Sequence, residues 1–159
     1  MAARRAGAAS VTISDIQASA AARAAALSGA DTLDAGERGV WDALAADPAF
    51  DVAIEAAGAA PALNNALASV EPGGRVVQVG FLPTEGVNLN RLIARELELL
   101  GSFRFVDEFE AAVAAVLDEP GLAQAITGTF AFGQTDVAFQ AAADKQQHLK
   151  VMIAGPGVL

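Results

Sequence analysis

Residues 50–80 constrain the fold of this chain more than any other stretch. Two short apolar runs, 50–55 and 75–79, lie on either side of a segment with helical character. Pro61 suits the first turn of a helix, where its missing N–H costs nothing. Apolar residues then recur at helical spacing at Leu63, Leu67 and Val70. Two apolar strands joined by one short helix predict a parallel, right-handed β-α-β unit.

The carboxyl ends of these two strands are where a ligand is expected. The first run ends at Ala56-Ala57-Gly58 and the second at Val79-Gly80-Phe81. In open parallel sheets, ligands bind beyond the carboxyl ends of the strands. A binding site of this chain is therefore predicted near these two segments.

The rest of the chain continues an alternation of strands and helices. We expect further strands at 11–14, 31–33, 97–103, 126–132 and 149–153. We expect further helices at 18–27, 36–46, 88–95, 109–117 and 136–143. Alternating elements with short connections favour an α/β fold with a doubly wound parallel sheet. The residues after 120 are expected to pack away from that sheet.

The composition limits the partners and the compartment. With 159 residues, the chain is long enough for one domain with a real core. Its net charge of −9 argues against nucleic acid and anionic membranes as main partners. No apolar run approaches the roughly 20 residues that cross a bilayer, and without cysteine there is no disulfide or thiolate metal site. We expect a cytoplasmic protein.

Asp15 stands at the end of the strand expected at 11–14. In a dinucleotide-binding fold, an acid at the end of the second strand accepts hydrogen bonds from the adenosine ribose hydroxyls. The same charge would repel a 2′-phosphate, which would select NAD over NADP. The alternative is a helix-capping aspartate before Ala18. The sequence leaves both roles open.

Several common catalytic motifs are absent from the sequence. A dinucleotide fold normally carries a G-x-G-x-x-G turn about 20 residues before the ribose-binding acid. Only 14 residues precede Asp15, and Gly7 is the only glycine among them. The chain has no tyrosine, and no Walker, nucleophile-elbow or zinc-protease motif. Its single histidine, His148, lies among glutamines and lysines and is expected to be solvated.

Two charged residues lie in apolar surroundings. Glu55 ends the run 50–55, where burying an unpaired carboxylate would be costly. We expect its charge to reach N–H donors or water at the strand end, rather than to catalyse. Arg104 stands between Phe103 and Phe105, and strand alternation would place it on the face opposite both rings. There it is either a solvated charge or a clamp for an anion or hydroxyl in a cleft.

The order of several motifs resembles that of a known family. The chain contains, in order, FDVAIEAAGA, PGGRVVQVGFLP, RELELLGSFRF and HLKVMI. These segments resemble the second half of medium-chain alcohol and polyol dehydrogenases, and most nearly the sorbitol and L-idonate 5-dehydrogenases. VTISDIQ and SGADTLDAG fall where that family has its second strand and its G-A-D segment. The resemblance covers nearly the whole chain.

The resemblance implies a reaction and a set of binding residues. The reaction is NAD-linked oxidation of a secondary alcohol on a polyol or sugar acid, with zinc polarising the alkoxide. By position, the cofactor-binding residues would be Asp15, Val79, Gly80, Phe81, Phe103, Arg104 and Phe105. Asp15 would hold the adenosine ribose, 79–81 would line the nicotinamide side of a cleft, and 103–105 would form its other wall. Arg104 would lie near the substrate oxygens.

The resemblance also implies how the chain is divided. The family's zinc ligands lie in an N-terminal domain, so we expect no metal ligand and no catalytic residue here. We expect residues 1–120 to form an incomplete NAD-binding domain, a Rossmann-like sheet without its first strand and phosphate loop. Residues 121–159 would return to the catalytic domain. We expect the chain alone to be inactive, and the subunit-pairing strand of the family, at 99–103, predicts a homo-oligomer.

Two other interpretations stay open. One is a non-catalytic module that binds a partner chain, or a second copy, through an exposed sheet edge. The other is a methyltransferase-like domain in which Asp15 binds the ribose of S-adenosylmethionine, although the glycine-rich loop before Asp15 is missing for this fold too.

The absence of the first strand of the sheet would leave apolar faces of the neighbouring strands uncovered. Burial of such surface is worth ~25 cal/mol per Å². We therefore expect a marginally stable or self-associating chain.

Overall fold

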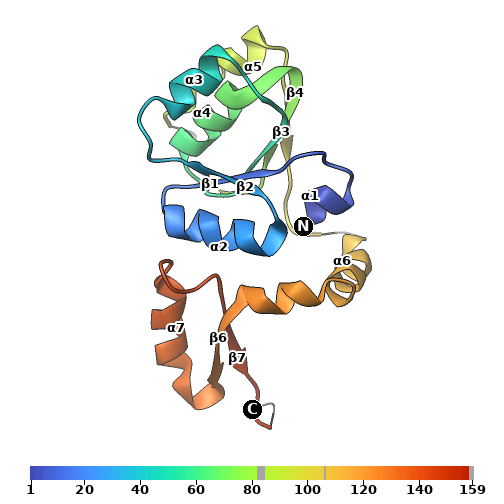
Figure 1. Cartoon of the computed structure of the whole chain (residues 1–159), viewed down its shortest axis with the longest axis vertical. Helices are drawn as coiled ribbons and strands as arrows, with labels where there is room; N and C mark the ends of the chain where they lie inside the picture. Colours follow the sequence, from blue (N-terminus) through green and yellow to red (C-terminus); the bar gives the residue numbers. More distant parts are fainter. Residues whose placement is uncertain (82–84, 106, 158–159) are drawn as a thin grey trace. The chain divides into compact units, whose positions relative to one another are not determined.

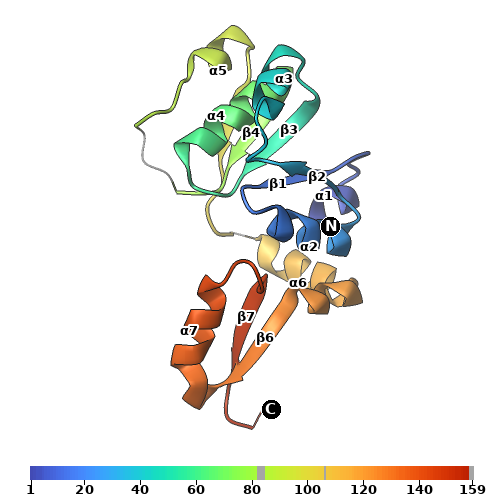
Figure 2. The ribbon, with the colours of Figure 1, turned by 60° about the vertical axis from the view of Figure 1, so that its left-hand side comes forward.

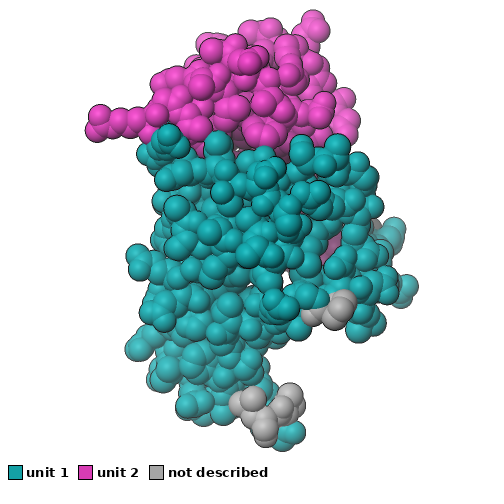
Figure 3. Space-filling model, in the orientation of Figure 1, with its two compact units in different colours: residues 1–37, 107–159 teal, residues 38–106 magenta. Residues whose placement is uncertain are grey.

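The computed structural model describes residues 1–81, 85–105 and 107–157. The chain forms two compact units (Figure 3). Residues 1–37 and 107–159 make up unit 1, and residues 38–106 make up unit 2. Each unit has its own parallel strands and its own covering helices, and each is described below by itself.

The helices and strands alternate along most of the chain, as expected for an α/β fold. In chain order they are α1 (Ala2–Arg5), β1 (Thr12–Asp15), α2 (Ala18–Ser28), β2 (Asp31–Asp34), α3 (Val40–Ala46), β3 (Phe50–Glu55), α4 (Ala60–Ser69), β4 (Val70–Gln78), α5 (Asn90–Ala94), β5 (Glu98–Gly101), α6 (Glu108–Leu117), β6 (Ile126–Ala131), α7 (Thr135–Ala143) and β7 (Lys150–Ala154) (Figure 1). Among the described residues the paired strands are parallel, in the orders β1-β2, β3-β4-β5 and β6-β7. The predicted fold class is confirmed.

The predicted β-α-β unit at residues 50–80 is the centre of unit 2. Strands β3 and β4 pair in parallel and are joined by α4, which has a proline in its first turn (Figure 2). The buried core of this unit consists of Leu63, Leu67, Val70, Val76 and Leu97. Because α4 contributes two of these side chains, the helix is held against one face of the sheet by burial of apolar surface.

The opposite face of the same sheet remains open to solvent. Side chains alternate between the two faces of a strand, so Val76 points to the core while its neighbour Val77 points away. In register with Val77 lie Ile54 on β3 and Leu100 on β5. Their exposed fractions are 63% and 45%. Unit 2 therefore carries an apolar sheet face that its own helices do not cover.

Arg95 joins the ends of two helices in unit 2. Its Nη1 atom donates to the carbonyl of Ala68 near the end of α4, at 2.7 Å, and its Nη2 atom donates to the carbonyl of Ala45 near the end of α3, at 2.6 Å. The last carbonyls of a helix have no intrahelical donor, and a positive charge there is favoured by the helix dipole. One guanidinium thus satisfies two helix ends at once.

Unit 1 combines segments from both ends of the sequence. Helix α2 packs against β1 and β2, while α7 packs against β6 and β7. In α2 only alanines, Ala21 and Ala25, are fully buried, which lets the helix lie close to its neighbours. The structure confirms the predicted strand, helix, strand order at 126–153.

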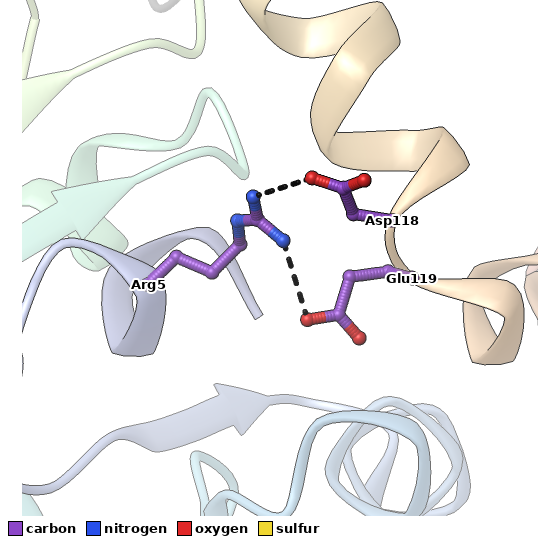
Figure 4. A network of polar contacts seen from close by, with 3 residues as sticks. All are labelled: Arg5, Asp118 and Glu119. Atoms are coloured by element: carbon purple, nitrogen blue, oxygen red, sulfur yellow. Dashed lines mark hydrogen bonds and ion pairs between the residues drawn. The ribbon is translucent and has the colours of Figure 1, made fainter.

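Side chains of α1 and α2 connect these distant segments. Arg5 lies 3.3 Å from Asp118 and 3.7 Å from Glu119, at the end of α6 (Figure 4). Arg23 of α2 donates to the carbonyls of Lys145 and Gln146. The Arg5 pairs are exposed, so their contribution to stability is small. They join segments that lie far apart in the sequence.

Several element boundaries differ from the prediction. The largest difference is at β4, which begins at Val70, a residue expected on the preceding helix, and not at Arg75. The strand expected at 97–103 ends at Gly101, and the helix expected at 36–46 begins at Val40. Within the described residues, no helix is both long and apolar enough to span a membrane. The predicted division of the chain at residue 120 stays a prediction.

The Arg95→Ala variant tests the double helix cap. We expect the free energy of unfolding to fall by about 2 kcal/mol, because a charged donor is lost and two carbonyls are left without it. Urea unfolding followed by circular dichroism measures this loss. Arg38→Ala, which removes an exposed arginine, should change it by less than about 0.5 kcal/mol. Equal stability of the two variants would contradict the capping role.

Candidate cofactor site

The candidate site lies at the carboxyl ends of β3, β4 and β5, as the sequence predicted for the first two strands. Parallel register brings these ends to the same edge of the sheet: Glu55 pairs with Gln78, and Gln78 pairs with Gly101. The segments that follow the three strands therefore meet in unit 2. These segments contain all of the predicted cofactor-binding residues except Asp15.

The turns after β3 and β4 touch backbone to backbone. A Cβ atom on Gly80 would lie 2.3 Å from the Gly58 nitrogen, and one on Gly58 would lie 2.5 Å from the Phe81 carbonyl oxygen. Gly58 also has a φ of +69°, in the left-handed region that favours glycine. Only glycine at both positions allows this approach.

Glu55 ends β3 as a buried carboxylate, with 3% of its surface exposed. Its Oε1 atom accepts hydrogen bonds from the N–H groups of Ala57 and Gly58, both at 2.8 Å. Its Oε2 atom accepts a hydrogen bond from the side-chain amide of Gln78. The expectation that Glu55 reaches N–H donors at the strand end is confirmed.

Gln78 completes this polar cluster but leaves one atom without a partner. Its Nε2 atom donates both to Glu55 and, at 2.6 Å, to the carbonyl of Gly80. These two acceptors fix the orientation of the amide. Its Oε1 atom is buried and has no hydrogen-bond partner in the described structure. A buried acceptor of this kind calls for a donor.

Phe81 and Phe103 come together from the ends of β4 and β5. Their ring centroids lie 5.3 Å apart at an interplanar angle of 87°, the edge-to-face geometry that aromatic pairs prefer. Both rings remain exposed, at 82% and 63%. The two segments predicted to form opposite walls of a cleft thus contact each other directly.

The predicted position of Arg104 is wrong. Strand β5 ends at Gly101, so the alternation of a strand does not apply to residue 104. Arg104 has a φ of +56°, and its guanidinium carbon lies 4.7 Å from the centroid of the Phe103 ring. This is the distance of a cation–π contact. Arg104 is therefore on the same side as Phe103, and its charge is exposed beside the aromatic pair.

The two remaining predicted residues of unit 2 are exposed. Val79 donates its N–H to the carbonyl of Glu55 at 2.8 Å and continues the contact between the strand ends. Phe105 lies beyond Arg104 with most of its surface exposed. Both stand in the segments that follow β4 and β5.

Asp15 lies in unit 1, at the end of β1. Its Oδ1 atom accepts the N–H of Gln17 at 2.8 Å, which is an Asx turn leading into α2. The N-cap residue of α2 is Gln17, so Asp15 does not cap the helix in the expected way. Its side chain is exposed at the strand end. The predicted contact with a ribose stays a prediction.

Two bound groups were implied by the family resemblance, NAD and zinc, and the described residues suit the first but not the second. The exposed rings of Phe81 and Phe103 and the exposed guanidinium of Arg104 are groups that an aromatic, charged cofactor such as NAD can contact. For zinc, the described residues contain no group of three or more His, Cys, Asp or Glu side chains arranged to hold a metal ion.

His148 is not solvated as expected. It is half-buried, and its Nδ1 atom lies 3.3 Å from the Thr127 hydroxyl.

Comparison with known proteins gives a consistent family. The family model for zinc-binding dehydrogenases matches residues 1–118. Sorbitol dehydrogenase of Bacillus subtilis (strain 168) is 33% identical over 115 residues, which cover 67% of this chain and 31% of that protein. L-idonate 5-dehydrogenase (NAD(P)(+)) of Escherichia coli (strain K12) is 32% identical over 109 residues, covering 65% of this chain and 31% of that protein.

The solved structures agree with the sequence matches. The crystal structure of L-idonate 5-dehydrogenase from Escherichia coli has a TM-score of 0.84 and 28% identity, and the match covers 96% of this chain and 45% of that chain. The chain spans less than half the length of these relatives. The predicted resemblance is confirmed, and the chain belongs to the zinc-binding dehydrogenase family.

Proposed function

We propose that this chain is the cofactor-binding part of an NAD-dependent dehydrogenase that oxidises a secondary alcohol of a polyol or sugar acid. The observation that carries the proposal is the cluster of Phe81, Phe103 and Arg104 beyond the strand ends, in a chain of the zinc-binding dehydrogenase family. The names of the relatives, sorbitol dehydrogenase and L-idonate 5-dehydrogenase, support the substrate class.

The residues of unit 2 would bind the nicotinamide half of the cofactor. Residues 79–81 and 103–105, which contact each other through Phe81 and Phe103, would both border the nicotinamide ring. When bound, NAD supplies the hydride acceptor, and the protein supplies orientation and electrostatics. The exposed guanidinium of Arg104, held against Phe103, would donate hydrogen bonds to substrate oxygens and attract the carboxylate of a sugar acid.

Asp15, in unit 1, would bind an adenosine ribose. Its Oδ1 atom is engaged by Gln17, but a carboxylate has further lone pairs with which to accept ribose hydroxyls. Its negative charge would disfavour a 2′-phosphate. We also propose that the division between the NAD-binding and catalytic domains lies at residue 120 and that the protein is cytoplasmic. Because the described residues do not fit zinc, we derive no step through a metal ion here.

Association of the chain with itself is part of the proposal. Strand β5 pairs only with β4 within the described structure, and Leu99 and Leu100 on it are exposed. An unpaired, apolar edge strand favours pairing with another chain. The same observation favours the alternative function, a non-catalytic module whose role is to bind a partner through this edge.

The isolated chain should bind NADH but not oxidise alcohols. We expect no rise in NADH absorbance when the purified chain is mixed with NAD, zinc and either sorbitol or L-idonate, because no metal-binding group lies within its described residues. Fluorescence titration should nevertheless detect NADH binding. Clear NAD reduction would contradict the first expectation, and absence of binding would favour the partner-binding alternative.

Asp15→Ala should weaken NADH binding and relax the preference against NADPH. Loss of hydrogen bonds to a charged acceptor costs about 1.4 kcal/mol, which is about tenfold in the dissociation constant. Fluorescence titration with each nucleotide measures both effects. Asp31→Ala, which removes an exposed carboxylate at the start of β2, serves as the control and should bind NADH like the wild type. Unchanged binding by Asp15→Ala would remove this residue from the site.

Sedimentation velocity tests self-association. We expect the wild-type chain to sediment as a dimer or larger species and Leu100→Lys to shift it toward the monomer, because a charge on an exposed edge strand opposes pairing. Glu71→Lys, on the exposed part of β4, introduces the same charge elsewhere in the sheet and should leave the dimer intact. A monomeric wild type at all accessible concentrations would contradict this proposal.

A further inference from the structure

The buried carboxylate of Glu55 has a role that the proposed function does not use. Its Oε1 atom accepts two consecutive backbone N–H groups, those of Ala57 and Gly58. Consecutive N–H groups that converge around a left-handed residue form a concave anion-binding site, often called a nest. Gly58 provides the left-handed conformation, with a φ of +69°. The nest after β3 is thus filled by a carboxylate of the same chain.

The surroundings of Glu55 hold it in this position. Its second oxygen accepts the Gln78 amide, which also donates to the Gly80 carbonyl. The side chain is 3% exposed, and a Cβ on Gly80 would lie 2.8 Å from its Oε2 atom. The carboxylate therefore has little room to leave the nest, and an anion from solution cannot reach the two N–H groups while it stays.

The filled nest and the charge of Glu55 bear on which ligand this strand end can accept. A phosphate brought to the turn would meet N–H groups already engaged and a negative charge within a few ångströms, and like charges repel strongly in a poorly solvated site. What remains accessible next to the filled turn is the exposed pair of rings, Phe81 and Phe103. Such an apolar aromatic surface suits an uncharged ring better than a phosphate.

We propose that Glu55 acts as an internal anion that fills the Ala57–Gly58 nest, so that the end of β3 excludes phosphate and accepts only the uncharged end of the dinucleotide. Glu55 is in this sense a specificity-determining residue. The inference rests on the proposed function for the identity of the cofactor. The filling of the nest stands on the hydrogen bonds alone.

Phosphate titrations of two variants test the nest directly. Glu55→Ala removes the internal anion and exposes both N–H groups, so inorganic phosphate should produce saturable shifts of the Ala57 and Gly58 amide signals in ¹⁵N–¹H spectra. Glu55→Gln keeps an oxygen that can accept both N–H groups, and these signals should not respond to phosphate. Asp51→Ala, which removes an exposed carboxylate from the same strand, is the matched control and should also not respond.

The wild-type chain supplies a readout that depends on no variant. Phosphate should leave its Ala57 and Gly58 signals in place, whereas NADH should shift the Gly58 and Gly80 signals. A phosphate response in the wild type, or none in a folded Glu55→Ala, would overturn the proposal. If Glu55→Ala does not fold, Glu55→Ser replaces it, since a serine side chain is too short to fill the nest in the same way.

These outcomes separate the inference from the proposed function. A wild type that binds no NADH rejects the proposed function, and with it the selection of the uncharged end. The phosphate response of Glu55→Ala still decides whether Glu55 fills the nest. A wild type that binds NADH while its Gly58 and Gly80 signals stay unmoved would reject the placement of the cofactor at this strand end.

Discussion

Burial of a few apolar side chains between α4 and one face of the β3-β4-β5 sheet is the interaction on which the candidate site depends. Leu67, Val70 and Val76 are the largest fully buried side chains in the described structure, and all three belong to this contact. Val70 and Val76 stand opposite Phe50 and Ala53 of β3, and the same register brings Glu55 level with Gln78. The contacts at the strand ends follow from that alignment, since neither turn could hold its geometry alone.

Sequence reasoning predicted those parts of the candidate site that depend on residues close together in the chain. The strand, helix, strand order at 50–80 follows from apolar runs and helical spacing, and the position of the ligand edge follows from parallel topology. That Glu55 would accept hydrogen bonds from N–H donors was predictable, because a buried carboxylate needs donors. The identity of those donors required the turn geometry of Gly58, which a glycine permits but does not dictate.

Other features depend on contacts between residues that are distant in the chain. Arg95 reaches carbonyls 27 and 50 residues away, and no local pattern signals a helix cap at that range. The position of Arg104 was predicted wrongly because β5 ends two residues before Phe103. The backbone then turns into the left-handed region at Arg104, where the period of a strand no longer applies. The neighbouring aromatic residue Phe103 was the sequence signal for the cation–π contact that Arg104 makes.

The uncovered face of the unit 2 sheet has a thermodynamic consequence. Apolar groups such as Ile54 and Leu100 already contact water in the folded chain, so unfolding exposes less new apolar surface than usual. The heat-capacity change should therefore fall below the typical ~12–15 cal/mol/K per residue. A smaller heat-capacity change flattens the curve of stability against temperature. Covering this face would restore the usual curvature, which links the thermal response of the chain to whatever binds there.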